Sequence, residues 1–113
     1  MPTENVTVGI ALVLSGALII AVCLPLLNGQ IKPNALYGVG MAKSFESDEN
    51  WFKMNRFGAK QMMLWAGAII VFGLAAFFLP LQGNKDLMAI VAIVPALLML
   101  IPVFQIYRYS KTL

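Results

Sequence analysis

The order of apolar and polar positions divides this chain into three long uncharged runs and one polar segment. The uncharged runs cover residues 6–27, 62–81 and 87–107, and the polar segment between the first two covers residues 28–61. As a helix rising about 1.5 Å per residue, each run is roughly 30 Å long, which matches the hydrocarbon thickness of a bilayer. The sequence therefore predicts an all-α membrane protein, a single membrane domain with three transmembrane helices.

Small residues recur at helical spacing in all three runs, and they mark the expected contact faces because they allow two helices to approach closely. They are Gly9, Gly16, Ala17 and Ala21 in the first run, Ala66, Gly73 and Ala76 in the second, and Ala92 and Ala96 in the third. The third run also holds Pro95 and Pro102 on nearly the same face. Two prolines so placed form either a hinge or a kink tolerated against neighbouring helices.

The polar segment has two parts with different residue chemistry. Residues 32–40 (KPNALYGVG) are rich in turn-forming types, which predicts a turn over Pro33–Gly38. From Ser47 onward the pattern predicts a helix, with Ser47 or Asp48 as its N-cap. Trp51 lies on the apolar face of this helix, and Asn55 lies one turn later against the same face, where a buried amide needs a partner.

The remaining positions of that helix make it amphipathic, with Met54, Phe57 and Gly58 on the apolar face. The basic residues fall largely on another face. They are Lys53, Arg56 and Lys60. We therefore expect an interfacial amphipathic helix that leads into the second span and turns its basic residues towards lipid headgroups.

The distribution of basic residues predicts an orientation in the membrane. Five lie in the polar segment, Arg108 and Lys111 lie in the C-terminal tail, and Lys85 alone lies between the last two spans. By the positive-inside rule, residues 28–61 and the C-terminus are cytoplasmic and the N-terminus is outside. Arg108 and Lys111 stand beside Tyr107 and Tyr109, a pattern typical of an interfacial anchor in contact with headgroups.

Composition narrows the possible functions. The chain is 60% hydrophobic and 12% charged, so its net charge of +3 points to the lipid bilayer as a partner and not to nucleic acid. It has no histidine and one cysteine, which excludes an intramolecular disulfide and a Cys/His metal cluster. We see no nucleophile–base pair, so we predict no catalytic residues, no cofactor and no metal site.

Several other residues and clusters can be interpreted either as functional or as purely structural. Cys23 is either a lipidated cysteine or a buried small hydrophobe, and its neighbour Val22 favours the second. The acidic cluster Glu46, Asp48 and Glu49 either binds a cation or stabilises a helix N-terminus. The seven methionines are scattered, which favours packing over copper binding. None of the three runs holds an ionisable group, which argues against ion-coupled transport.

The polar segment resembles the SdpI family, whose members typically read P-N-x-x-x-G-I-R, a short Ser/Thr-rich link and a W-x-x-x-N-R-x-G helix between two spans. The matching residues are Pro33, Asn34, Tyr37, Gly38, Val39, Lys43, Ser44, Phe45, Asp48, Trp51, Asn55, Arg56, Phe57 and Gly58. The resemblance covers residues 25–73. One departure is Gly40, which stands where the family usually has an arginine. Lys43 is a candidate replacement, but lysine lacks the two-pronged geometry of arginine.

The resemblance implies a function, because the family is named for an integral membrane immunity protein that protects a bacterium from its own secreted toxin. It implies a non-enzymatic protein of the bacterial inner membrane that acts by binding, in immunity or signalling. An alternative is a structural accessory subunit of a larger membrane complex, with a membrane-protein partner or a second copy of the chain. A transporter is a third, weaker alternative. In either main reading we expect an ordered polar cap held by Trp51 and Asn55.

Overall fold

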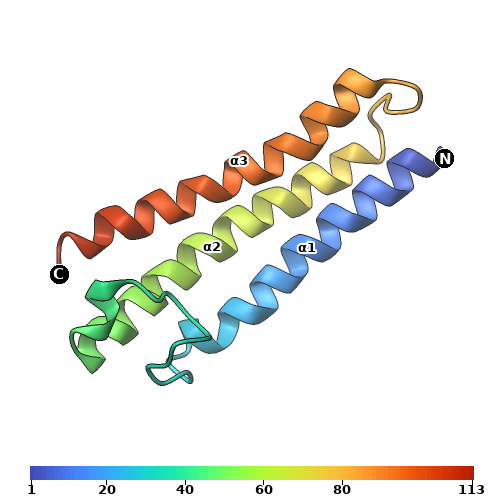
Figure 1. The fold of residues 1–113 in the computed structure, drawn as a ribbon. Helices are drawn as coiled ribbons and strands as arrows, with labels where there is room; N and C mark the ends of the chain where they lie inside the picture. Colours follow the sequence, from blue (N-terminus) through green and yellow to red (C-terminus); the bar gives the residue numbers. More distant parts are fainter.

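The computed structural model describes residues 1–113 and contains only helices and connecting segments. The elements are α1 (Thr3–Leu27), the short 3₁₀ helix η1 (Ala42–Phe45), α2 (Asp48–Ala76) and α3 (Lys85–Ser110) (Figure 1). The three α-helices are all long and apolar enough to cross a membrane. The expectation of an all-α protein with three membrane-spanning helices is confirmed.

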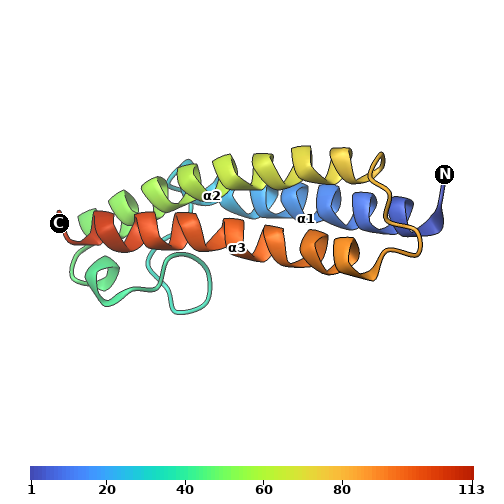
Figure 2. The ribbon, with the colours of Figure 1, turned by 90° about the horizontal axis from the view of Figure 1, so that it is seen from above.

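The helices form an elongated antiparallel bundle in which α2 lies between α1 and α3 (Figures 1 and 2). The bundle measures 52 × 23 × 19 Å, so its long axis exceeds the roughly 30 Å of a hydrocarbon core. Residues 28–47 and the C-terminus lie at one end, and the N-terminus and the connection between α2 and α3 lie at the other. We call the first the basic end, because every basic residue except Lys85 lies there.

Close backbone packing joins α1 to α2 through glycines. A Cβ placed on Gly16 would lie 2.7 Å from the Ala66 carbonyl oxygen. A Cβ placed on Gly73 would lie 2.8 Å from the Cβ of Leu12, so larger residues at either position would force the helices apart. Such close approach is how helices associate in a membrane, where the hydrophobic effect does not draw them together.

The small-residue faces predicted for the other positions are only partly right. Ala66 and Ala76 are fully buried, as expected. The remaining alanines, in α1 and α3, are exposed. They are Ala17, Ala21, Ala92 and Ala96. In α1 the buried stripe repeats every seven residues and leaves the alanines to one side; it consists of Gly9, Gly16 and Cys23. Helix α3 meets α2 through larger residues, namely Val91, Pro102 and Ile106.

The amphipathic helix expected between the first two spans is not a separate element. It forms the first turns of α2, which continues without interruption from Asp48 to Ala76. This stretch contains no proline, and its glycine at position 58 is packed against neighbouring segments, so nothing breaks the helix between the amphipathic and apolar parts.

Helix α2 ends at Ala76, earlier than the end predicted at residue 81, because Pro80 has no N–H to donate to the Ala76 carbonyl, and Asn5 binds this terminus. The Asn5 side-chain amide donates to the carbonyls of Ala76 (2.8 Å), Phe77 (3.2 Å) and Leu79 (2.6 Å). None of these carbonyls accepts the i+4 amide of an α-helix: those of Ala76 and Leu79 accept instead from the amides of Leu79 and Leu81, and the buried Asn5 side chain adds a donor from α1. The two prolines of α3, by contrast, lie inside one continuous helix from Lys85 to Ser110.

Candidate functional site: the polar cap

The polar cap consists of residues 28–47 and the first turns of α2, to Gly58. Its backbone between residues 31 and 43 donates no hydrogen bond to another backbone carbonyl. A segment without helix or strand bonds must satisfy its polar groups in another way. Side chains from the cap itself accept from three of these amides, those of Leu36, Tyr37 and Val39.

Asn34 builds the first turn of the cap. Its side-chain oxygen accepts hydrogen bonds from the backbone amides of Leu36 (2.9 Å) and Tyr37 (2.6 Å). Its side-chain nitrogen donates to the backbone carbonyls of Lys32 (2.8 Å) and Tyr37 (3.0 Å). Four hydrogen bonds to one side chain fix the turn over residues 33–38. The ring of Pro33, directly before Asn34, fixes its own φ and further limits the freedom of the backbone.

Trp51 and Asn55 fasten this segment to α2. Both side chains are buried, at 0% and 1% exposure. The Trp51 indole N–H donates to the carbonyl of Ile31 at 2.9 Å, and the Asn55 side-chain oxygen accepts from the Val39 amide at 2.6 Å. Asn55 also donates to the Trp51 carbonyl at 2.9 Å, so both ends of the buried amide have partners.

Gly38 lies where the cap segment crosses α2, and only glycine suits that position. Its φ is +125°, a conformation that residues with a Cβ rarely adopt. A Cβ there would also lie 2.6 Å from the Asn55 side-chain oxygen and 3.0 Å from ring carbons of Trp51. Beside it, the Tyr37 hydroxyl donates to the Val22 carbonyl and ties the cap to α1.

The cap also reaches α3 through Gly58. A Cβ on Gly58 would lie 2.9 Å from the Val39 side chain and 3.1 Å from that of Ile106. The glycine therefore lets one point of α2 contact the cap segment and α3 together. The resemblance named Gly58, Gly38, Asn55 and Trp51 from sequence, and the structure brings all of them into one contact region.

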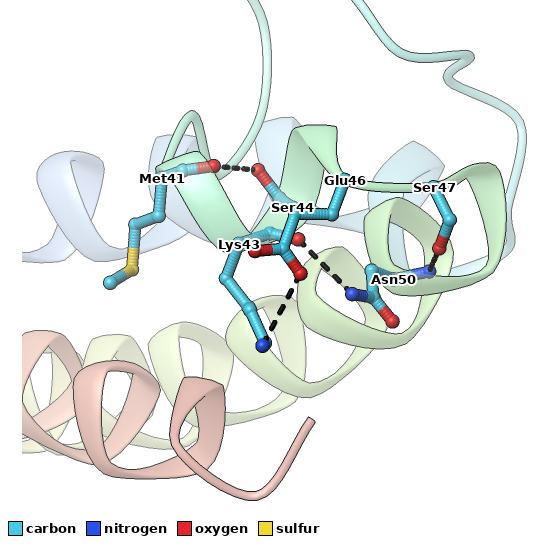
Figure 3. A network of polar contacts seen from close by, with 6 residues as sticks. All are labelled: Met41, Lys43, Ser44, Glu46, Ser47 and Asn50. Atoms are coloured by element: carbon cyan, nitrogen blue, oxygen red, sulfur yellow. Dashed lines mark hydrogen bonds and ion pairs between the residues drawn. The ribbon is translucent and has the colours of Figure 1, made fainter.

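Ser44 closes the second half of the cap (Figure 3). Its side chain is fully buried, and its hydroxyl donates to the carbonyls of Met41 (2.5 Å) and Val39 (2.8 Å). The sequence indicates no role for this hydroxyl beyond the place of Ser44 in the resemblance. A buried serine within an irregular segment is the signal that would have found it, because such a hydroxyl is nearly always bonded.

The start of α2 joins this network. Ser47, one of the two predicted candidates, is the N-cap, and its hydroxyl accepts from the Asn50 amide at 3.0 Å. The Asn50 side chain donates back to the Lys43 carbonyl at 3.3 Å, and Lys43 pairs with Glu46 at 3.2 Å (Figure 3). Two of the three residues in the acidic cluster are thus ion-paired, since Glu49 pairs with Lys53 at 2.7 Å.

The glycine at position 40 leaves open space. A Cβ there would meet only the Phe45 ring, at 3.8 Å, which is ordinary contact. The backbone would therefore accept the arginine that the family usually has. Lys43 does not replace that arginine as a free cation, because its ammonium is paired with Glu46.

Three of the predicted headgroup-contact residues line one hollow of about 240 Å³ between α2 and α3. They are Lys53, Arg56 and Lys60. Its remaining lining is aromatic: the rings of Phe57 and Tyr109 stack with their centroids 4.2 Å apart. We call this the basic hollow. Sequence periodicity placed the three cations on one face, but it could not show that a tyrosine from α3 completes the site.

The other two predicted headgroup residues lie on α3. The Arg108 guanidinium lies 5.9 Å from the centroid of the Phe104 ring, and the Lys111 ammonium lies 4.6 Å from that of Tyr107. Arg56 has a further contact that sequence reasoning missed. Its Nε donates to the Leu27 carbonyl at 3.3 Å, where a cation suits the negative end of the α1 dipole.

The Glu49–Lys53 pair alters the pKa of both groups. The hydrogen bond and charge of Lys53 lower the pKa of the Glu49 carboxyl, and Glu49 correspondingly raises the pKa of Lys53. The stability from Glu49 is present above its ordinary pKa and is lost as pH falls through the lowered value. The stability from Lys53 is lost as pH rises through the raised pKa of its ammonium group. Both side chains are exposed, so the effect is small and is screened by salt.

Comparison with known proteins agrees with the resemblance drawn from the residues. A family model described as the SdpI/YfhL protein family matches residues 30–105, which include most of the polar cap, all of α2 and most of α3. No curated protein and no solved structure matches the chain. The family is not a known enzyme family, and membership suggests a membrane protein of the immunity type.

Proposed function

This chain belongs to the SdpI/YfhL protein family, and from that premise we propose that it acts by binding, in immunity or signalling, in the bacterial inner membrane. In this proposal the N-terminus is outside, and the polar cap and the C-terminus are cytoplasmic. The distribution of basic residues over the two ends of the bundle supports this orientation.

The observation that carries the proposal is the way the cap is built. Its irregular backbone is bonded to side chains that are themselves buried, chiefly Asn55, Trp51 and Ser44. A surface fixed before its ligand arrives loses little conformational freedom on binding, which favours affinity. A cap of this construction is suited to recognition of a lipid headgroup and of a protein at the membrane surface.

The basic hollow gives this surface its ligand chemistry. Lys53, Arg56 and Lys60 converge around two stacked rings, and the hollow lies at the end of the bundle where headgroups are expected. Lys53 and Arg56 already have one partner each, at Glu49 and the Leu27 carbonyl. Lys60 forms no ion pair within the chain, so its ammonium is available to an anionic phosphate.

Native mass spectrometry of the protein released from its own membrane in mild detergent tests this proposal. We expect retained phosphatidylglycerol, and we expect the K53Q/K60Q variant to retain several-fold less of it. The variant K32Q/K85Q removes the same charge from exposed residues outside the basic hollow that have no predicted headgroup contact, and it serves as the matched control. Equal loss from both variants would mean that net charge, and not the basic hollow, holds the lipid.

The second candidate, an accessory subunit, is favoured by the outer face of α3. Ala92 and Ala96 are exposed one turn apart beside exposed Ile93 and Leu97, and no other helix of the chain covers them. In the same mass measurement, a partner held by α3 would be lost from A92L/A96L and kept in K53Q/K60Q. A lone monomer in both would count against the accessory reading.

A further inference from the structure

Leu36 is the most exposed large hydrophobic residue of the chain. Its side chain is 98% exposed, at the tip of the turn that Asn34 fixes with four hydrogen bonds. A leucine on a mobile loop can move out of water, but the rigid turn keeps this one in place. Apolar surroundings would remove this side chain from water and stabilise the arrangement.

The turn that carries Leu36 lies against the membrane-spanning helices. The Tyr37 hydroxyl bonds to the carbonyl of Val22, which is more than one helical turn before the end of α1 at Leu27. Figures 1 and 2 show the segment after α1 folded beside the bundle near that end. The turn thus lies beside the last two turns of α1.

Leu36 also continues a surface made of lipid-facing residues. It lines an apolar cavity of about 360 Å³ beside all three helices. Two other lining residues, Val22 on α1 and Val103 on α3, are 45% and 56% exposed within spans long enough to cross the bilayer. Because these valines face acyl chains, the leucine next to them faces the same environment.

Part of the backbone of the turn is hydrogen-bonded to side chains and needs no water. The amides of Leu36, Tyr37 and Val39 donate to side-chain oxygens of Asn34 and Asn55. Side-chain donors also satisfy nearby carbonyls, namely those of Ile31, Lys32, Tyr37 and Val39. The amides of Asn34, Ala35 and Gly38 have no acceptor within the chain, so the backbone of the turn suits the hydrated headgroup layer, from which the Leu36 side chain reaches the acyl chains.

From these observations we propose that the turn over residues 34–38 inserts into the bilayer and places Leu36 among the lipid acyl chains at the basic end. The turn then attaches the cap to the membrane at a second place. It contacts acyl chains, whereas the basic hollow contacts headgroups. The inference concerns the lipid surface and is independent of which protein the cap recognises.

Depth-dependent fluorescence quenching in nanodiscs tests the proposal. The natural thiol is removed by C23A, and a polarity-sensitive probe is attached to L36C or, as a matched control in the same cap, to E46C. Both native side chains are exposed, so neither substitution should disturb folding. With lipids brominated on the acyl chains, we expect strong quenching and a blue shift at position 36 and neither at position 46.

Reaction with a water-soluble maleimide gives a second measurement that needs no probe. The thiol of L36C should react several-fold more slowly than that of E46C in nanodiscs, and the two rates should converge when both proteins are unfolded in detergent. Equal quenching and equal reactivity at the two positions would overturn the proposal. Slow reaction at position 36 without quenching by brominated lipid would also overturn it, because a protein segment would then cover Leu36.

Discussion

Replacing Trp51 with alanine should lower the free energy of unfolding by about 3–5 kcal/mol, the range for removing a large buried aromatic side chain. The ring is completely buried, its centroid lies 5.5 Å from that of the Phe45 ring, and it packs against Gly38. Its indole N–H also holds the Ile31 carbonyl. The loss can be measured by denaturant titration of the purified protein in detergent.

The control for this variant is W51F, which keeps an aromatic ring and removes the indole donor. Its expected cost is about 1–2 kcal/mol, from the lost hydrogen bond and a smaller ring. Trypsin supplies a local measurement, because W51A should expose Lys43 in the cap segment to cleavage while α1 and α3 stay protected. A W51A protein with wild-type stability and wild-type cleavage would contradict this role for Trp51.

Replacing Gly38 with alanine should cost about 2–4 kcal/mol, from two separate causes. The positive φ of +125° is strained for alanine, and the new Cβ would lie 2.6 Å from the Asn55 oxygen that holds the Val39 amide. We expect a lower melting temperature in detergent and the same cleavage of the cap segment as in W51A.

Gly83 provides the matched control for Gly38. It also has a positive φ, of +70°, but a Cβ there would meet nothing within 4 Å. The G83A variant therefore carries backbone strain alone, about 1 kcal/mol, and leaves the cap intact. Equal destabilisation by G38A and G83A would show that close packing of the cap against Trp51 and Asn55 contributes nothing.

Much of this architecture was predictable because it depends on local chemistry. Charge-free runs of membrane length specify the three helices, since no charged group interrupts them. The N-cap at Ser47 follows from residue type and position. Burial of Trp51 and Asn55 follows from their shared helical face. These features need only neighbours within a few turns.

Other features depend on residues that are distant in sequence, and helical periodicity carries no signal for them. The last carbonyl of α2, that of Ala76, accepts a hydrogen bond from the side chain of Asn5, 71 residues earlier. The basic hollow needs Tyr109 from α3 to stack on Phe57. The spacing of Ala17 and Ala21 predicts that they lie on a contact face. In the structure, α2 approaches α1 from another direction and contacts Gly9 and Gly16.

The central claim is that side chains of α2 hold the irregular cap segment in one conformation, and the amide of Val39 reports on it directly. This amide lies outside any helix and donates only to the side chain of Asn55. Hydrogen exchange in nanodiscs should show Val39 protected as strongly as amides within α2, and N55L should remove that protection. If the Val39 amide of the unaltered protein exchanges as fast as that of Gly83, which has no acceptor, the cap is not ordered in this way.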